Sequence, residues 1–370
     1  MKICLVAELF YPNLGGGEKY LFEMAQSLAE EGHQVKVLTS WKSGRKERLK
    51  LNERLEVYYF DWREISGHPY PKNQDLEKYW VWADVIHTSL YTAALATFWR
   101  NLSTAKNRRK PLVLTVFEVI DRDWWLAEKN WFKAVSLYLF EKLCINLPFQ
   151  AFLPISEATK QSLSRGRFLK PKINEVIYPV VSCEVVKTKA KIKNYYLYYG
   201  RPGQTKGVYI LLRAIKALIE KQSDYGNEFH LVLGLKPASE REKIVDFIKN
   251  EKLEKRVKVF EPLDRDELNR KIVEAKAVIV PSLTEGFGYS AFEACQKNKL
   301  VIVSKACSLP EVVFGKIIFF ERNNEHSLCE AILAADQNHY QEIKKPVRIC
   351  DGQHTFNQLT TVYQRVIRKS

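Results

Sequence analysis

Apolar runs that have the length of a β-strand alternate along the chain with stretches of helical periodicity. Residues 2–9 form the first such run. After a glycine-containing turn at residues 12–17, apolar side chains recur at helical spacing as far as Gly32. A second apolar run follows at residues 35–39. A strand, a helix and another strand in this order predict a βαβ unit with parallel strands.

The alternation continues through the first half of the chain and begins again in the second half. In the first half we predict strands at residues 83–87, 112–116, 151–155 and 176–178, and a helix at 156–164. A lysine-rich segment without glycine, residues 187–194, interrupts the pattern and is typical of a linker. In the second half we predict strands at residues 195–199, 230–234, 257–260, 277–280 and 300–304, and helices at 209–220, 241–250, 264–275, 289–297 and 356–368.

Two successive sets of βα units predict an α/β protein in which two Rossmann-like, doubly wound domains face a cleft. A length of 370 residues agrees with two domains rather than one. We expect the first domain at residues 1–186, the second at 187–352 and a C-terminal helix at 353–370. Ligands of open α/β sheets bind beyond the carboxyl ends of the strands, so we expect the chemistry in the loops that follow the strands.

Composition and charge narrow the class of protein without naming a ligand. Hydrophobic residues make up 46% of the chain and charged residues 27%, which indicates a folded globular protein. The net charge of +15 attracts nucleic acid, anionic lipid or phosphorylated small molecules. Seven scattered cysteines, with no Cys-x-x-Cys pair, indicate free thiols in a reducing compartment. The short N-terminal run does not have the length of a signal peptide, and no apolar stretch is long enough to predict a membrane span.

The first glycine-rich loop lies between the first strand and the first helix. Gly16 and Gly17 let backbone N–H groups approach a ligand closely, and the following helix N-terminus favours an anion. The same residues also suit a simple tight turn. The spacing does not complete the Gly-x-Gly-x-x-Gly pattern of a dinucleotide site, because Tyr20 occupies the third glycine position.

Two further loops carry charged residues in positions that suit a diphosphate. Arg201 and Lys206 lie in a loop between a strand and a helix, where a guanidinium fork and an ammonium group can contact phosphate oxygens. Gly286, Phe287 and Gly288 offer backbone donors at the next such helix N-terminus. Taken singly, residues of these types in a loop are more often solvated surface residues than parts of a binding site.

Two glutamates flank the second of these loops. Glu285 precedes it and could accept hydrogen bonds from sugar hydroxyls, and Glu293 could accept both hydroxyls of a ribose. On a helical wheel Glu293 lies opposite the apolar arc of its helix, which is the usual position of a solvated side chain.

The order and spacing of these loops resemble the GT-B glycosyltransferases of family 4. Glu285 and Glu293 match the E-x7-E motif of that family, and the loop with Arg201 and Lys206 matches its phosphate-binding loop. The resemblance extends over nearly the whole chain, through the segments at residues 15–18, 32–35, 84–87, 154–157 and 308–311.

The resemblance implies a retaining hexosyltransferase that needs neither a metal ion nor a cofactor beyond its sugar donor. The domain at residues 187–352 would bind a UDP- or GDP-linked sugar, and the domain at 1–186 would bind a glycan or lipid-linked acceptor. Arg201 and Lys206 would neutralise the leaving diphosphate, and Glu285 would orient the sugar. The other donor-binding residues would be Glu293, Gly16, Gly17, Gly286, Phe287 and Gly288. The helix at 353–370 would pack back toward the first domain. The implied location is the cytoplasm, at the inner face of a membrane.

The acceptor side departs from the family pattern at one position. Members of the family often carry His-Asp or His-Gly after the strand that is residues 112–116 here, whereas this chain has Phe117 and Glu118. A phenylalanine side chain cannot hydrogen-bond a sugar hydroxyl. Four explanations remain. The backbone at Phe117 binds the sugar hydroxyl, or Glu118 replaces the usual side chain, or the sugar donor differs at this position, or the enzyme has lost its activity. His87, in the matching segment at 84–87, is a further acceptor-side candidate.

An aromatic and basic region follows. Trp124, Trp125 and Trp131 lie within eight residues, with lysines nearby, and suit contact with a carbohydrate or with a membrane interface. The helical spacing from residue 132 to residue 143 favours instead a core helix. We expect peripheral contact with an anionic membrane, such as an enzyme of polysaccharide biosynthesis would make.

Three other functions fit part of the sequence. A GT-B epimerase would convert the nucleotide sugar without transferring it, and an inactive GT-B scaffold would only bind a partner. A nucleic-acid-binding protein would explain the net charge but not the diphosphate loops, and the chain lacks the aromatic and basic motif of a known nucleic-acid module. We therefore expect no nucleic-acid partner.

Overall fold

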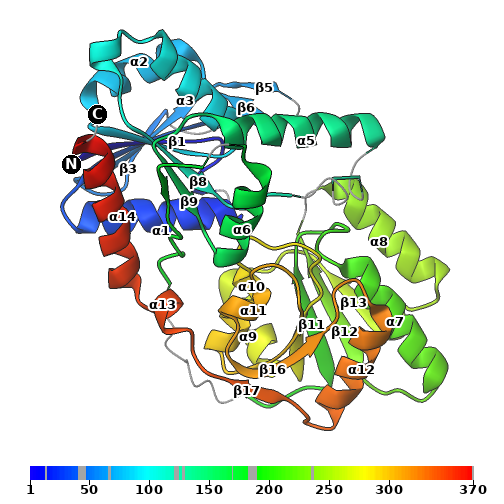
Figure 1. The fold of residues 1–370 in the computed structure, drawn as a ribbon. Coiled ribbons are helices and arrows are strands. Elements are labelled where there is room, and N and C mark those ends of the chain that lie inside the picture. The colour runs from blue at the N-terminus through cyan, green and yellow to red at the C-terminus, as the bar shows by residue number, and fades with distance from the viewer. Residues whose placement is uncertain are drawn as a thin grey trace. The chain divides into compact units, whose positions relative to one another are not determined.

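The structure is a computed structural model of the chain, shown in Figure 1. It describes residues 1–12, 15–40, 47–65, 68–120, 125–126, 130–168, 170–181, 190–234 and 237–368. Contacts within the chain divide it into two units. The first unit consists of Met1–Arg122, Trp131–Ser182 and Val347–Ser370, and the second unit consists of Asp123–Asn130 and Cys183–Pro346. The predicted boundary between residues 186 and 187, with the beginning of the predicted linker, lies outside the described residues.

The first unit is built on one mostly parallel sheet with the order β10-β9-β8-β7-β1-β2-β4-β3. Its strands are β1 (Lys2–Ala7), β2 (Gln34–Ser40), β3 (Arg48–Lys50), β4 (Leu55–Phe60), β7 (Val85–Ser89), β8 (Leu112–Val116), β9 (Ala151–Pro154) and β10 (Ile173–Asn174). Only β3 is antiparallel to its neighbour among the described pairings, and a separate hairpin is formed by β5 (Arg63–Ile65) and β6 (His68–Tyr70). The central strands are buried along their length because helices cover both faces of the sheet.

The helices of the first unit come from both ends of the chain. They are α1 (Gly16–Glu30), α2 (Asn73–Trp82), α3 (Thr92–Ser103), α5 (Trp131–Asn146), α6 (Glu157–Gly166), α13 (Val347–Cys350) and α14 (Gly352–Arg368), with a short 3-10 turn at Lys106–Arg108. Helix α14 packs against α1, and the ring of Phe356 stacks on that of His33 at a centroid distance of 6.1 Å. The C-terminal residues therefore complete the core of the first unit.

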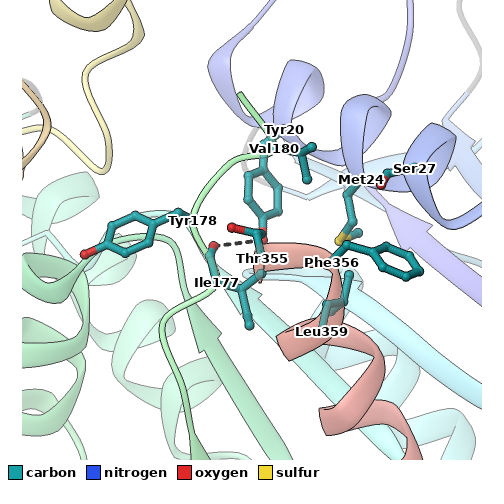
Figure 2. Close-up of a pocket in the computed structure, with 9 residues that line it drawn as sticks. All are labelled: Tyr20, Met24, Ser27, Ile177, Tyr178, Val180, Thr355, Phe356 and Leu359. Atoms are coloured by element: carbon teal, nitrogen blue, oxygen red, sulfur yellow. Dashed lines mark hydrogen bonds between the residues drawn. The ribbon is translucent and has the colours of Figure 1, made fainter. Parts of the chain in front are cut away.

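A small gap remains where α14 meets α1 (Figure 2). Met24 of α1 and Phe356 and Leu359 of α14 line it, and nearby the hydroxyl of Tyr20 donates a hydrogen bond to the carbonyl of Ile177 at 3.2 Å. Its volume of about 10 Å³ is at the lower limit for a single water molecule. We interpret it as a packing gap rather than a ligand site.

The second unit is built on a sheet with the order β13-β12-β11-β14-β15-β16-β17. Its strands are β11 (Tyr195–Gly200), β12 (Glu228–Leu233), β13 (Val257–Phe260), β14 (Ala277–Val280), β15 (Leu300–Ser304), β16 (Gly315–Phe320) and the antiparallel β17 (Gln341–Ile343). Its helices are α7 (Val208–Lys221), α8 (Ala238–Asn250), α9 (Arg265–Glu274), α10 (Tyr289–Gln296), α11 (Leu309–Val312) and α12 (Glu325–Asp336). A continuous core of aliphatic and aromatic side chains joins the sheet to α7, α8 and α12.

Both sheets reverse their strand order at one point. In the first unit the reversal lies between β1 and β7, which pair directly, and in the second unit it lies between β11 and β14. The loops that follow these strands diverge to opposite sides of the sheet at such a point, and ligands of doubly wound folds bind there. The prediction of two doubly wound α/β sheets is confirmed.

One predicted strand is wrong. Residues 176–178 form no strand, although the N–H of Ile177 donates to the carbonyl of Pro154 at 3.0 Å. The short strand that does pair with β9 is β10, a few residues earlier. The apolar character of the predicted segment has another cause, because Ile177 packs against α1 and α14 in the gap of Figure 2.

Candidate active site

The predicted donor residues meet at the reversal point of the second sheet. Gly200 ends β11 and Arg201 follows it, while Glu285 follows β14 in the next strand along the sheet. The two loops are joined by a hydrogen bond from the N–H of Leu283 to the carbonyl of Thr205 at 2.8 Å. Loops that are 78 residues apart in the sequence therefore form one surface.

An ion pair lies at the centre of this surface. The ammonium group of Lys206 is 3.0 Å from a carboxylate oxygen of Glu285, and their side chains are 17% and 14% exposed. The hydroxyl of Ser282 donates to the same carboxylate oxygen at 2.9 Å, and that of Ser308 donates to the backbone carbonyl of Glu285 at 3.0 Å. Partial burial and the Ser282 hydroxyl fix the carboxylate in place, and Ser308 holds the backbone of Glu285, unlike a solvated surface pair.

Two glycines allow the loops to approach so closely. Gly207 has φ of +71°, and a Cβ atom on it would lie 1.8 Å from the carbonyl oxygen of Pro281. Gly288 caps α10 with φ of +92°, and a Cβ atom there would lie 2.6 Å from the side chain of Leu309. Only glycine adopts such angles without strain, and only glycine has no side chain to collide with the neighbouring atoms. The backbone conformation therefore requires glycine at both positions.

The backbone amides at the start of α10 come from a buried segment. Gly286, Phe287 and Gly288 are all buried, and the ring of Phe287 packs against those of Tyr289 and Phe292. The side chain of Phe287 is therefore part of the core. Only its backbone remains available to a ligand.

Glu293 is buried, so the alternative interpretation of Glu293 as a solvated surface side chain is wrong. It is 7% exposed, and every residue from Ala291 to Cys295 on α10 is buried. One carboxylate oxygen of Glu293 lies 3.2 Å from the guanidinium of Arg265, the first residue of α9. Burial, and then the negative charge of Glu293, raise the pKa of the Tyr199 hydroxyl. Helical periodicity could not predict this, because α10 is covered on both of its sides.

Arg201 is exposed at the rim of the same surface. The hydroxyl of Tyr198 donates to the carbonyl of Arg201 at 2.9 Å, which holds the loop backbone. Arg265 is the residue of this group that sequence reasoning missed. Nothing in its local sequence distinguishes it from the other arginines of the chain.

The structure brings together two candidates of the first unit that the sequence places 100 residues apart. Gly17 is the second residue of α1, and a Cβ atom on it would lie 3.3 Å from the ring of Phe117, which follows β8. The ring of Phe117 also contacts that of Tyr20 edge-on, at a centroid distance of 5.7 Å. Gly16 starts the same helix, one residue earlier. The backbone carbonyl of Phe117 accepts a hydrogen bond from Thr159 at 3.3 Å.

Acidic side chains surround the reversal point of the first sheet. Glu8 follows β1, and its carboxylate accepts hydrogen bonds from the N–H and the hydroxyl of Thr92 at 2.6 and 2.5 Å. Glu141 of α5 is fully buried and accepts from the hydroxyl of Tyr91 at 2.9 Å and from the N–H of Ile120 at 3.1 Å. Burial raises the pKa of the Glu141 carboxyl to about 7, and the nearby charge of Glu118 acts in the same direction.

His87 lies in the core of the first unit rather than on a surface. It is fully buried, and its two ring nitrogens hydrogen-bond the hydroxyls of Tyr363 at 2.6 Å and Thr115 at 2.7 Å. Burial lowers the pKa of His87 to about 3, so the ring is neutral near pH 7. Because Tyr363 belongs to α14, His87 holds the C-terminal helix on the core of the first unit.

The aromatic and basic region divides between core and surface. Trp124 lies outside the described residues, while Trp125 is buried. The expectation that the apolar stripe of residues 132–143 belongs to the core is wrong. Phe132 is 80% exposed, Leu139 60% and Leu143 50%, because α5 packs on the sheet with the opposite side, through Ala134, Leu137, Glu141, Cys144 and Ile145.

Among the residues that the structure describes, no group of three acidic, histidine or cysteine side chains is placed to hold a metal ion. Within the same residues, no helix is long and apolar enough to cross a bilayer. The five cysteines whose side chains are described are free thiols.

Two family models match the chain. The model described as Glycosyltransferase Family 4 matches residues 14–185, and the model described as Glycosyl transferases group 1 matches residues 184–348. Together they span the loops of both sheets. This chain belongs to the GT-B glycosyltransferases of family 4. The predicted resemblance is thereby confirmed, and the protein is a glycosyltransferase by family.

Individual relatives agree with this assignment. The chain is 24% identical over 355 residues to the GPI3 subunit of phosphatidylinositol N-acetylglucosaminyltransferase from Saccharomyces cerevisiae, a match that covers 89% of this chain and 74% of that protein. It is 25% identical over 357 residues to the MMP alpha-(1->4)-mannosyltransferase of Mycolicibacterium hassiacum, which covers 85% of this chain and 83% of that one.

Solved structures share the fold. The sucrose-phosphate synthase from Thermosynechococcus elongatus has a TM-score of 0.78 at 17% identity, over 100% of both chains. HepE from Anabaena, solved in complex with UDP-glucose, has a TM-score of 0.71 at 16% identity, over 100% of this chain and 99% of that one. The prediction of the GT-B fold is therefore confirmed.

Proposed function

We propose that this glycosyltransferase moves a hexose from a UDP- or GDP-linked sugar to a hydroxyl of a glycan or lipid-linked acceptor. The configuration at the anomeric carbon is retained, and neither a metal ion nor a further cofactor takes part. The observation that carries the proposal is the partly buried Lys206–Glu285 pair at the reversal point of the second sheet. Glu293, on the helix that follows this loop, is buried.

Cations at this point bind and stabilise the leaving diphosphate. Lys206 is held by Glu285 before any donor binds, so its ammonium group needs no reorganisation when negative charge develops on the leaving group. Arg201 is exposed in the same loop and adds a guanidinium that can contact two phosphate oxygens. The backbone amides of Gly286 and Gly288 at the start of α10 supply further donors.

The two glutamates bind different parts of the donor. Glu285 accepts hydroxyl groups of the transferred sugar, because its carboxylate lies beside the cations that hold the phosphates. Glu293 accepts the ribose hydroxyls. A carboxylate has two acceptor oxygens, which suits the two hydroxyls of a cis-diol.

The acceptor binds to the first unit, at the loop after β8. Here the backbone of Phe117 or the carboxylate of Glu118 contacts an acceptor hydroxyl, because the phenyl ring is occupied by Gly17 and Tyr20. The leaving phosphate accepts the proton of the attacking hydroxyl, so the reaction needs no protein base. Relatives named as a mannosyltransferase and as a component of phosphatidylinositol N-acetylglucosaminyltransferase support a lipid or glycan acceptor. We place the reaction at the inner face of a membrane.

A thermal-shift screen against UDP- and GDP-sugars tests the donor site. A ligand at about 100 times its Kd stabilises the folded protein by about 2.7 kcal/mol. We expect one nucleotide class to raise the Tm of the wild type and to have no effect on Glu293→Ala or Arg201→Ala. The matched control is Arg213→Ala, which breaks an exposed ion pair with Glu325 in the same unit and should keep the full shift.

Turnover separates the rival functions. Transfer of a labelled sugar to a lipid or glycan acceptor, with the donor's anomeric configuration in the product by NMR, supports the proposal. Formation of the epimeric nucleotide sugar without an acceptor would identify an epimerase. Donor binding without either product would identify an inactive scaffold, and inversion in the product would refute retention.

A further inference from the structure

Helix α5 has two faces of different character. Its inner face packs on the first unit, while Phe132, Leu139 and Leu143 form a row on its outer face. Positions that are three, four or seven residues apart lie on one side of a helix, so these side chains are neighbours. Trp131, at the beginning of α5, is 61% exposed and extends the row. Single exposed apolar residues are ordinary, but a contiguous row marks a binding surface.

A second segment adds to this surface at the end of α5. Phe168 is 86% exposed, and its N–H donates to the side chain of Asn146 at 2.8 Å. The side-chain amide of Asn146 donates in turn to the carbonyl of Gly166 at 3.3 Å, and the guanidinium of Arg167 donates to the carbonyl of Ile145. These contacts hold the backbone of Phe168, whose side chain is exposed, beside the last turn of α5.

The two segments that carry this surface expose charges of one sign. Exposed charged side chains in residues 131–148 and 161–172 are, where the structure describes them, all cationic: Lys133, Arg165, Lys170 and Lys172. The one acidic residue in these two segments of the sequence is Glu141, which is buried. An apolar row bordered by lysine and arginine complements an anionic bilayer, where aromatic and aliphatic side chains enter the headgroup region and cations contact phosphates.

We propose that the outer face of α5, with Trp131, Phe132, Leu139, Leu143 and Phe168, is a membrane-docking surface for anionic phospholipid. The surface lies flat on the bilayer and does not cross it. This inference extends the proposed function, because it places the enzyme at the membrane that contains a lipid-linked acceptor. It rests on the proposed function only where it assumes that the acceptor is lipid-linked. The exposure and the charge of the surface do not depend on the proposed function.

The inner face of the same helix connects this surface to the acceptor loop. Glu141 on α5 holds the N–H of Ile120 and the hydroxyl of Tyr91, next to the loop that carries Phe117 and Glu118. A bilayer on the outer face therefore lies about one helix diameter, roughly 10 Å, from that loop. A lipid-linked hydroxyl group can be presented to the loop without leaving the membrane.

Vesicle sedimentation tests the surface directly. We expect the wild type to bind vesicles that contain phosphatidylglycerol and to bind phosphatidylcholine vesicles far less. The triple variant Phe132→Ser, Leu139→Ser, Leu143→Ser should lose at least roughly tenfold in affinity, because three apolar side chains no longer leave water. Val81→Ser on α2 is the control. Its side chain is 76% exposed in the same unit, and its replacement should leave binding unchanged.

Fluorescence locates the helix at the bilayer. Brominated lipid should quench part of the tryptophan emission of the wild type, and Trp131→Phe should reduce that quenching while binding persists. Equal binding by the triple variant and the wild type, or no binding of the wild type to anionic vesicles, would overturn the proposal. So would a wild-type dimer in light scattering that the triple variant abolishes, since the face would then join two copies of the chain.

The donor screen keeps the two proposals apart. Loss of vesicle binding in the triple variant with an unchanged nucleotide-sugar shift supports the docking surface. The opposite result is vesicle binding that depends on the apolar row, with no change of Tm on addition of any nucleotide sugar. It would refute the donor assignment and still support the docking surface.

Discussion

The two sheets each reverse their strand order once, but the loops at their reversal points carry opposite chemistry. In the second unit the loops after β11 and β14 present Arg201 and Lys206 together with glycine amides. In the first unit the loops after β1, β7 and β8 present carboxylates and aromatic rings. One point of the fold thus suits a diphosphate, while the other suits a molecule rich in hydroxyl groups. The shared topology provides the place, and the side chains decide the ligand.

The same contrast extends to how closely the backbone packs. The second unit forces Gly207 against Pro281 with a positive φ, whereas Gly17 in the first unit faces only the ring of Phe117. Close backbone packing makes the proposed phosphate site rigid. A ring that can shift by a few tenths of an ångström leaves the proposed acceptor side more adaptable.

The largest effect should follow loss of the Lys206 ammonium group. Lys206→Ala removes a preorganised cation from the leaving diphosphate and should lower kcat by roughly 10²- to 10³-fold. It also leaves the partly buried Glu285 without its cation. Lys305→Ala, which breaks an exposed pair with Glu321, should keep wild-type kcat in the same transfer assay. Equal kcat values in both variants would remove the electrostatic role of the second unit.

Glycine substitutions compare the packing of the two units. Gly207→Ala should destabilise the protein by more than about 2 kcal/mol, because the added methyl group meets a backbone carbonyl and the positive φ is strained. Gly315 has φ of +79° with open space around it, so Gly315→Ala measures the strain alone, about 1 kcal/mol.

Gly17→Ala completes this series in the first unit. Its Cβ atom would meet only the edge of the Phe117 ring, so we expect a loss below about 1 kcal/mol. Urea unfolding of the three variants gives the ranking. A Gly17→Ala loss as large as that of Gly207→Ala would contradict the difference between the units.

The buried carboxyl of Glu141 should make the first unit less stable as pH rises. Its pKa of about 7 in the folded protein lies above its ordinary value of 4.5, so the folded state holds the proton more tightly between these values. Stability therefore falls from about pH 4.5 to pH 7 and stays low above pH 7. Glu141→Gln should remove this loss and gain up to about 3 kcal/mol relative to the wild type at about pH 8, and little at about pH 4.5.

The measurement is urea unfolding of both proteins at the two pH values. His87 acts in the opposite direction, because its pKa of about 3 makes the fold lose stability as pH falls below 6.5. His87 is present in both proteins, so it cancels in the difference. Glu31→Gln, at an exposed carboxyl of the same unit, is the control. A pH-independent difference between wild type and Glu141→Gln would refute the assignment.

The smallest effect should come from metal removal. If the carboxylates of the first unit bind hydroxyl groups rather than a cation, prior treatment with EDTA should leave kcat and KM unchanged. A loss of activity that added Mg²⁺ or Mn²⁺ restores would show that a metal site had been mistaken for an acceptor site.

Local features of the sequence were enough to predict much of the architecture. Continuous apolar runs and period-3.6 patterns placed most strands and helices within a few residues, as at β8, because burial on both faces makes parallel strands continuously apolar. Glycine and charge spacing marked the loops with Lys206 and Glu285. The surplus of basic residues and the tryptophans indicated an anionic surface as partner.

Tertiary structure decided which side of each helix is covered. A helical wheel shows that Phe132, Leu139 and Leu143 share a face of α5 and that Glu293 lies opposite the apolar arc of α10. It does not show what packs there. The structure leaves the apolar row of α5 exposed and buries Glu293 against Arg265, which lies 28 residues earlier in the chain. In both cases the environment that the helical wheel favoured was wrong, because a wheel does not show which segments pack on a helix.

The sequence by itself determined the repeating βα order, the family motifs and the loops in which chemistry had to be sought. Only the folded chain decided that His87 bonds Tyr363 from 276 residues away, and that Glu141 of α5 holds the loop after β8. Periodicity is a local property of the backbone, whereas burial and charge pairing depend on contacts between segments far apart in the chain. Local patterns therefore predict elements and faces, and long-range packing assigns each side chain its environment.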